Sequence, residues 1–156
     1  MGPEIPLRVA PPAAADEVAR LLAGFRSFYG SDEPSDAEML ATVKQLIGTP
    51  GAEYLLAGDP PAGIAQMRFR LSVWTGTEDA WVEDVFVEEG ARGQGLGRAL
   101  IEGCVQRARE RGCARIQLDA NEKNPPALAL YDSLGFRSGT PDRWDAGRDL
   151  YFTLWL

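Results

Sequence analysis

The sequence contains no histidine and only two cysteines. Without histidine, the chain cannot itself supply a Ser-His-Asp triad, a Cys-His pair or a histidine-ligated metal site. Cys104 and Cys113 form no C-x-x-C motif, and no secretory signal pattern opens the sequence. These absences predict chemistry without a metal, in a reducing, cytoplasmic setting.

Long apolar runs and an excess of positive charge are also missing. No apolar stretch approaches the ~20 residues that a membrane-spanning helix needs. The 16 basic residues are outnumbered by 23 acidic ones, which gives a net charge of −7. This balance argues against a nucleic-acid binder or a binder of anionic membranes. It permits a cationic substrate, although ordinary solubility explains it as well.

Residues 81–97, WVEDVFVEEGARGQGLG, organise the rest of the chain. Trp81, Glu83, Val85 and Val87 alternate with the residues between them, which predicts a strand with Glu83 and Val85 on one face. A glycine-rich turn and a helical pattern follow the strand. Glycines allow close backbone approach, and the first N–H groups of a helix have no internal partner, so the stretch predicts an anion site.

The spacing of the glycines shows which known phosphate-binding motifs this turn does not match. A mononucleotide P-loop needs Lys-Ser/Thr after its last glycine, whereas Arg98 and Ala99 follow Gly97. A dinucleotide fingerprint G-x-G-x-x-G needs a third glycine where Arg98 or Leu100 stands. Asp119 does imitate the ribose-binding acid of that fold. A nucleotide-dependent oxidoreductase therefore stays open as an alternative.

Periodic patterns place the remaining elements, and the chain length favours one domain over residues 1–156. The segments between residues 53 and 87 look like consecutive antiparallel strands with short links. Ser35 and Glu38 form a capping box. The expected strands are 5–10, 53–57, 62–74, 81–87, 115–119, 136–138 and 150–155, and the expected helices are 13–29, 35–47, 95–111 and 124–134.

Two motifs carry a family resemblance. Arg92-x-x-Gly95-x-Gly97 after a strand resembles the Q/R-x-x-G-x-G/A signature of the GNAT superfamily of acyl-CoA-dependent N-acyltransferases. The run NPPALALYDSLGF at 124–136 is similar to the N-x-x-A-x-x-L-Y-x-x-x-G-F block that follows in that family. The resemblance covers about residues 81–136, and residues 1–75 show no comparable motif. It implies a mixed α+β fold, a mostly antiparallel twisted sheet of about six to seven strands flanked by about four helices.

The resemblance also implies the reaction, transfer of an acetyl group from acetyl-CoA to a primary amine by direct attack in a ternary complex. The pyrophosphate of coenzyme A would lie on the glycine turn, and Asn124 would also contact the cofactor. Backbone groups of the strand would pair with the pantetheine arm, with the Val85 N–H polarising the thioester carbonyl. The implied cofactor-binding residues are Val85, Phe86, Val87, Arg92, Gly93, Gln94, Gly95, Leu96, Gly97, Arg98, Asn124 and Tyr131.

Acid–base roles follow from the same resemblance. Tyr131 falls on the general-acid tyrosine of the family and would protonate the departing thiolate; a core tyrosine is the alternative interpretation. Glu83 is the first choice for the base, and Asp119 is the second. Each carboxylate could instead be solvated or paired structurally, and Asn124 could be a plain helix cap.

The acceptor is less defined by the sequence. Glu83 and Asp84 resemble the acidic strand segment of polyamine- and diamine-acetylating relatives and would attract an ammonium group. Phe25, Tyr29, Trp74 and Trp144 could wall the pocket, with a cation against an aromatic face. A small-molecule amine is the first expectation, and a protein lysine or N-terminus is an alternative. A non-catalytic acyl-CoA-binding or regulatory module also stays open, and a homodimer is expected by analogy only.

Overall fold

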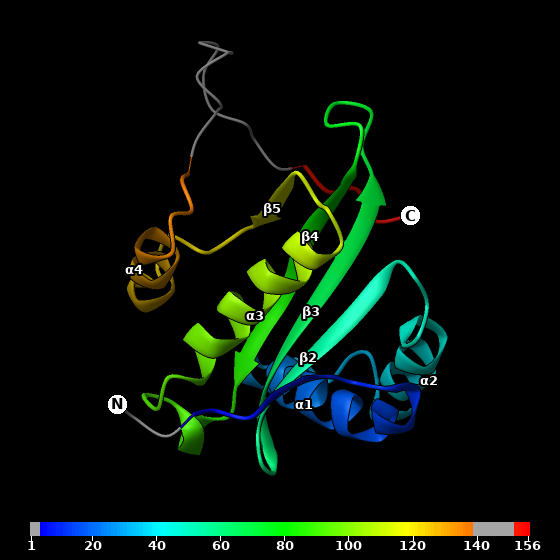
Figure 1. The fold of residues 1–156 in the computed structure, drawn as a ribbon. Coiled ribbons are helices and arrows are strands. Elements are labelled where there is room, and N and C mark those ends of the chain that lie inside the picture. Colours follow the sequence, from blue (N-terminus) through cyan, green and yellow to red (C-terminus); the bar gives the residue numbers. More distant parts are fainter. Residues whose placement is uncertain (1–3, 139–151) are drawn as a thin grey trace. The chain divides into compact units, whose positions relative to one another are not determined.

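The computed structural model describes residues 4–138 and 152–156 (Figure 1). The chain divides into two compact units, Met1–Asp119 and Ala120–Leu156. Each unit is described by itself. Whether the whole chain forms the single domain expected from its length stays a prediction.

The first unit contains a sheet of five strands in the order β1-β2-β3-β4-β5. The first four strands run antiparallel to their neighbours, as the short links predicted, and β4 and β5 run parallel. Five strands in the described residues are fewer than the expected six to seven. The strands are β1 (Leu7–Val9), β2 (Ala52–Gly58), β3 (Pro61–Leu71), β4 (Glu78–Val87) and β5 (Arg115–Leu118).

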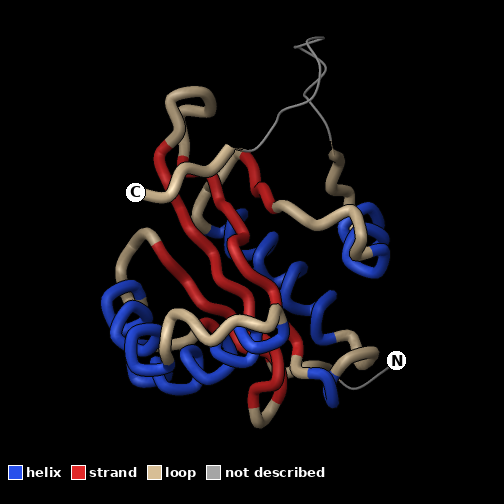
Figure 2. The backbone as a smooth tube through the Cα atoms, turned by 180° about the vertical axis from the view of Figure 1, so that it is seen from behind, coloured by secondary structure: helices blue, strands red, loops and turns tan. Residues whose placement is uncertain are grey.

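Helices cover both faces of this sheet (Figures 1 and 2). On one face lie α1 (Ala15–Phe28), which follows the short turn η1 (Pro12–Ala14), and α2 (Asp36–Leu46). The opposite face carries α3 (Leu96–Glu110), which follows the turn η2 (Glu89–Ala91). The predicted capping box opens α2, since Ser35 accepts from the Glu38 N–H and the Glu38 carboxylate accepts from the Ser35 N–H.

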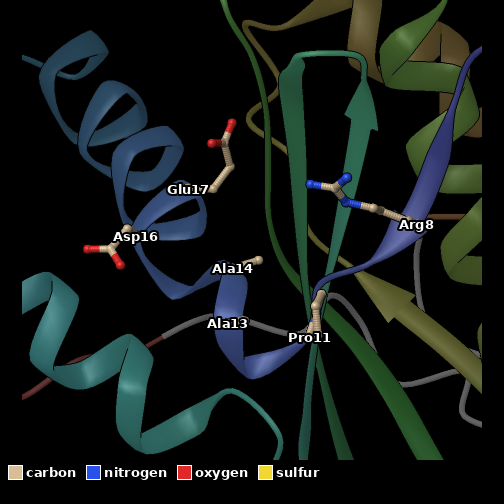
Figure 3. Close-up of a pocket in the computed structure, with 6 residues that line it drawn as sticks. All are labelled: Arg8, Pro11, Ala13, Ala14, Asp16 and Glu17. Carbon is tan, nitrogen blue, oxygen red and sulfur yellow. The ribbon is translucent and has the colours of Figure 1, made fainter.

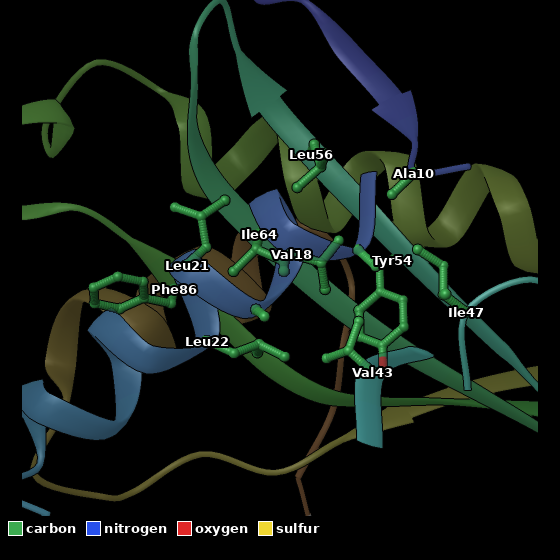
Figure 4. Packing of buried hydrophobic residues seen from close by; sticks show 12 residues of the cluster. Ala10, Val18, Leu21, Leu22, Val43, Ile47, Tyr54, Leu56, Ile64 and Phe86 are labelled. Carbon is green, nitrogen blue, oxygen red and sulfur yellow. The ribbon is translucent and has the colours of Figure 1, made fainter. Parts of the chain in front are cut away.

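The core between α1, α2 and the sheet is apolar, because the three- and four-residue spacing of α1 turns one stripe toward the strands (Figure 4). Val18 and Leu21 of α1 are fully buried there. They pack with Leu56, Ile64 and Phe86 of β2, β3 and β4. Burying each such side chain contributes about 1.5–3 kcal/mol, so this face of the sheet is held firmly.

On the opposite face, a glycine and an ion-pair network fix α3. A Cβ on Gly103 would meet the methyl ends of Leu7 and Leu55, so any larger residue here would require these side chains to shift. The Glu53 carboxylate of β2 accepts hydrogen bonds from Arg107 of α3 and from Arg111, which directly follows the helix. These contacts hold α3 in line with the strands, and its first turn follows directly from the glycine-rich loop.

The second unit contains α4 (Pro125–Ser133), which ends before Gly135 at a positive φ of 88°. Residues 136–138 and 152–156 have no regular secondary structure, so the closing strands expected there are wrong for these described residues. The rest of the second predicted closing strand falls outside the described residues. In the part of the chain that the structure describes, no helix is both long and apolar enough to cross a membrane.

Candidate active site

A β-bulge interrupts β4 at Glu83. Asp84 lies opposite Gln66 of β3, whereas Val82 lies opposite the next residue, Met67, which leaves Glu83 as the extra residue. The expected unbroken alternation of residues 81–87 is therefore wrong at this point. Because paired residues share a face, Asp84 and Phe86 lie on the side of α1 and α2.

Beyond the bulge, one edge of β4 has no paired strand among the described residues. β5 pairs with β4 only from Asp79 to Val82, and β4 continues to Val87. The Glu88 N–H donates to the Ala62 carbonyl of β3 at 2.9 Å. Since N–H groups alternate in direction along a strand, those of Val85 and Val87 point away from β3. The Val85 N–H therefore points toward the open edge, in the direction that the sequence motif assigns to the thioester.

The glycine turn places an uncapped helix N-terminus beside the end of β4. Gly95 is the N-cap of α3 with a φ of 89°, a conformation that favours glycine, and no side chain caps the helix there. Because Gly95 has no side chain, the N-cap residue supplies no acceptor for the first N–H groups of α3. Such a terminus carries partial positive charge and favours an anion.

Gly97 is the most informative glycine of the turn. A Cβ built on Gly97 would meet nothing within 4 Å, and the residue has no positive φ. Folding alone would favour alanine at this helical position by roughly 0.5–1 kcal/mol. Gly103 on the same helix packs closely against Leu7 and Leu55, whereas Gly97 leaves open space in front of the helix N-terminus. This space is of the kind that a phosphate group needs.

The basic side chains of the turn have fixed positions. The Arg92 Nε donates to the Val87 carbonyl at 3.0 Å, and the guanidinium lies 4.7 Å from the centre of the Phe28 ring. Arg98 pairs with Glu102 at 3.3 Å, one helical turn along α3. The Gln94 amide donates to the Gly90 carbonyl, and Leu96 is buried. Two cations thus flank the uncapped first turn of α3.

The carboxylates Glu83, Asp84 and Asp119 influence one another at the end of the β4–β5 pairing. Burial, together with the negative charges of Glu83 and Asp119, raises the pKa of Asp84 from its ordinary 3.8 to about 6. Glu83 and Asp119 are exposed, whereas Asp84 is half-buried. A carboxylate with a pKa near 6 is suited to remove a proton at neutral pH. Asp84, which the sequence offered only as a substrate contact, is therefore the stronger base candidate.

Asp84 ends a polar row across the sheet. Tyr54 of β2 lies opposite Gln66 of β3, and Gln66 lies opposite Asp84, so the three side chains share the α1–α2 face. Burial raises the pKa of Tyr54 to about 12, and the charges of Glu83 and Asp84 contribute, against an opposing effect of Arg68. Sequence reasoning missed Gln66 and Tyr54, because only the strand register places them beside Asp84.

Aromatic side chains from α1 adjoin this face. Phe25 lies 5.5 Å from Phe86 and 5.1 Å from Tyr29 between ring centres. Tyr29 is 69% exposed, so its ring is accessible. Trp74 lies instead in the turn between β3 and β4, 84% exposed, at the opposite end of β4 from Phe86. The structure therefore brings Phe25 and Tyr29 together but not Trp74, and Trp144 lies outside the described residues.

The second unit holds the other two predicted site residues. Asn124 caps α4, with its side-chain oxygen accepting from the Ala127 N–H at 3.3 Å. The helix-cap interpretation of Asn124 is thus confirmed, and it leaves a cofactor contact open. Tyr131 lies on α4, half-buried, with its ring centre 5.9 Å from that of Phe136.

A pocket of about 470 Å³ lies elsewhere in the first unit, where β1 leads through η1 into α1 (Figure 3). Arg8 contributes from β1 and Glu17 from α1. The pocket contains none of the predicted site residues. Its lining consists of Arg8, Pro11, Ala13, Ala14, Asp16 and Glu17. Within residues 4–138 and 152–156, no group of three or more Cys, Asp or Glu side chains is placed so that it could hold a metal ion.

Comparison with known proteins agrees with the glycine turn and the open strand. The sequence profile of the Acetyltransferase (GNAT) family matches residues 16–136. The chain therefore belongs to the GNAT acetyltransferase family, which confirms the resemblance drawn from the two motifs. One similar solved structure comes from Arthrobacter sp. FB24 and carries the name of an acetyltransferase. It superposes with a TM-score of 0.87 at 30% identity, and the match covers 100% of this chain and 98% of that one.

Named relatives differ in the substrates that their names state. A thialysine N-epsilon-acetyltransferase of Sus scrofa is 34% identical over 94 residues, 57% of this chain and 55% of that protein. A ribosomal protein bS18-alanine N-acetyltransferase of Escherichia coli K12 is 38% identical over 63 residues, 40% and 43% respectively. The chain thus spans about half or less of the curated relatives it matches.

Proposed function

We propose that this protein is an N-acetyltransferase that moves an acetyl group from acetyl-CoA to a primary amine of a small, cationic molecule. The observation that carries the proposal is the open space at Gly97, before an uncapped helix N-terminus and next to the open edge of β4. Membership of the GNAT family supports the same reaction class.

Acetyl-CoA fits the residues of the first unit. Its pyrophosphate would accept from the first N–H groups of α3, with Arg92 and Arg98 flanking it. The pantetheine amides would pair with backbone groups of β4 beyond Val82, where no β5 residue is paired. The Val85 N–H would donate to the thioester oxygen, on which negative charge develops during attack.

The reaction then requires proton transfers at the nitrogen and at the sulfur. Asp84 takes one proton from the ammonium, and the nitrogen lone pair attacks the thioester carbon. As the carbon–sulfur bond breaks, Tyr131 supplies a proton to the sulfur, and the second proton of the nitrogen returns through solvent to the Tyr131 phenolate. Asp84 then releases its proton to solvent, so the products are the N-acetyl amine, CoA thiol and one proton. The role of Tyr131 rests on the sequence motif.

A cationic small molecule is favoured as acceptor by the acids beside the open edge. Glu83, Asp84 and Asp119 lie close enough for their charges to interact, and an ammonium would relieve their repulsion. Phe25 and Tyr29 offer ring faces next to Phe86 on the same side of the sheet. A soluble, cytoplasmic enzyme without a nucleic-acid or membrane partner fits the net charge of −7.

The test is release of free thiol from acetyl-CoA in the presence of spermidine, lysine, an aminoglycoside or a short peptide. We expect release with a small polycationic amine, together with its acetylated product. Release with the peptide alone would identify a protein acetyltransferase. A thermal shift with acetyl-CoA but no release would indicate an acyl-CoA-binding module, and the absence of both would contradict the proposed cofactor site.

A further inference from the structure

Gln66 is a polar side chain that the fold leaves without a partner. The residue is 7% exposed, its backbone is paired in the sheet, and its side-chain amide has no hydrogen bond to any of the residues that the structure describes. The neighbouring row on the same face, Leu56, Ile64 and Phe86, is apolar. The Gln66 amide atoms are not among the fully buried, unpartnered side-chain atoms of the described residues, so the amide still reaches solvent and can bind a ligand there.

The strand register directs Gln66 toward the acids. Gln66 and Asp84 are directly opposite on β3 and β4, a pairing that brings Cα atoms to roughly 5.5 Å where backbone hydrogen bonds are exchanged. Beyond the bulge, Asp84 and Phe86 alternate regularly and share the face of Gln66 and Ile64. The bulge at Glu83 places Val82, only two residues from Asp84, on the opposite face. The register beyond the bulge therefore places a carboxylate and an amide side by side.

We propose that Gln66 determines the acceptor specificity by binding the amine nitrogen: its side-chain oxygen accepts one N–H of a primary ammonium while Asp84 faces another. The assignment rests on the proposed acetyl transfer. The carboxylate removes one proton, and the amide, which cannot, keeps hold of a remaining N–H and so orients the lone pair. A primary ammonium has enough hydrogens to satisfy both groups and still react.

Kinetics test this role with three variants. Gln66→Met keeps the length of the side chain but removes the acceptor oxygen, so KM for the amine should rise about 10-fold or more while KM for acetyl-CoA stays the same. Gln66→Glu keeps an oxygen at the same position and should restore a low amine KM. Ile64→Val alters packing on the same strand and face, and it should change neither KM. An unchanged amine KM in Gln66→Met, or equal changes in both KM values, would overturn the proposal.

A binding measurement separates this proposal from the proposed reaction. The side-chain amide signals of Gln66, identified in ¹⁵N–¹H spectra by their loss in Gln66→Met, should shift when butylamine is added and not when butan-1-ol is added. If the amide signals shift but the protein acetylates no amine, the proposed reaction is contradicted and the ammonium site is supported. Amine acetylation without any shift would remove Gln66 from the site and leave the reaction standing.

Discussion

The Nε of Arg92 donates a hydrogen bond of 3.0 Å to the backbone carbonyl of Val87, at the last residue of β4. This bond joins the end of the strand to the start of the glycine turn. The Arg92 guanidinium also lies over the Phe28 ring of α1. One side chain thus links the proposed cofactor loop to the helix that borders the acceptor face.

Replacing Arg92 with lysine should loosen this junction although the charge is kept. Lysine has no Nε–H in the required direction and no planar group to lie on Phe28. We expect a loss of about 1–2 kcal/mol in the free energy of unfolding and weaker acetyl-CoA binding. Arg109→Lys, an exposed arginine in the last turn of α3, is the matched control in calorimetry. Equal acetyl-CoA affinities for the two variants would refute the role of Arg92.

Gly97→Ala tests the phosphate site directly. Because the added methyl group meets no atom of the protein, the variant should be as stable as the wild type or more stable, by up to ~1 kcal/mol. Acetyl-CoA affinity should fall at least ~10-fold, since the methyl group would occupy the space of the pyrophosphate. Thermal melting and titration calorimetry measure the two effects. Unchanged affinity would mean that no phosphate approaches α3 at Gly97.

Asp84→Asn should change how the stability of the folded protein depends on pH. In the folded protein the pKa of Asp84 is raised from 3.8 to about 6, because burial disfavours the charged form. The ionised carboxylate therefore costs stability above pH 6, this cost declines between pH 6 and 3.8, and it is absent below. The melting temperature of the variant should exceed that of the wild type at pH 8, and the gap should shrink toward pH 4. A gap that is independent of pH would contradict the raised pKa.

Tyr131→Phe should lower kcat by about 10²-fold if the phenol protonates the departing thiolate. KM for acetyl-CoA should change little, because only a hydroxyl is lost. Phe136→Leu disturbs the neighbouring ring without removing a proton donor, so it serves as the packing control. Turnover of Tyr131→Phe equal to that of the wild type across the pH range would exclude the acid role.

Much of the local structure was predictable from the sequence, because local signals specify it. Ser35 and Glu38 predicted the start of α2, and the glycines after β4 predicted the turn before α3. The bulge at Glu83 was not predictable, since residues on both sides of it alternate normally and only pairing with β3 shows the extra residue. The position of Gln66 was missed for the same reason: a strand's face is set by partners distant in sequence.

The choice among the carboxylates illustrates the same limit. Glu83 was the first candidate for the base because an unbroken strand would place it on the face of Val85. In the structure Glu83 is the extra residue of the bulge. The stronger candidate for the base is Asp84, which is more buried and faces α1 and α2. Burial depends on tertiary packing, so no spacing rule in the sequence distinguishes the two neighbouring acids.

The pH dependence of kcat/KM for the acceptor, measured in parallel for the wild type, Asp84→Asn and Glu83→Gln, tests the central claim most directly. An amine with a pKa near 10 stays an ammonium throughout the range, so the acidic limb reports the enzyme's base. We expect an acidic limb near pH 6 in the wild type. In Glu83→Gln the limb should remain but lie at a lower pH, because the charge of Glu83 helps to raise the pKa of Asp84. In Asp84→Asn the limb should be lost, with a large fall in rate. A limb that persists in Asp84→Asn and disappears in Glu83→Gln would contradict the account and make Glu83 the base.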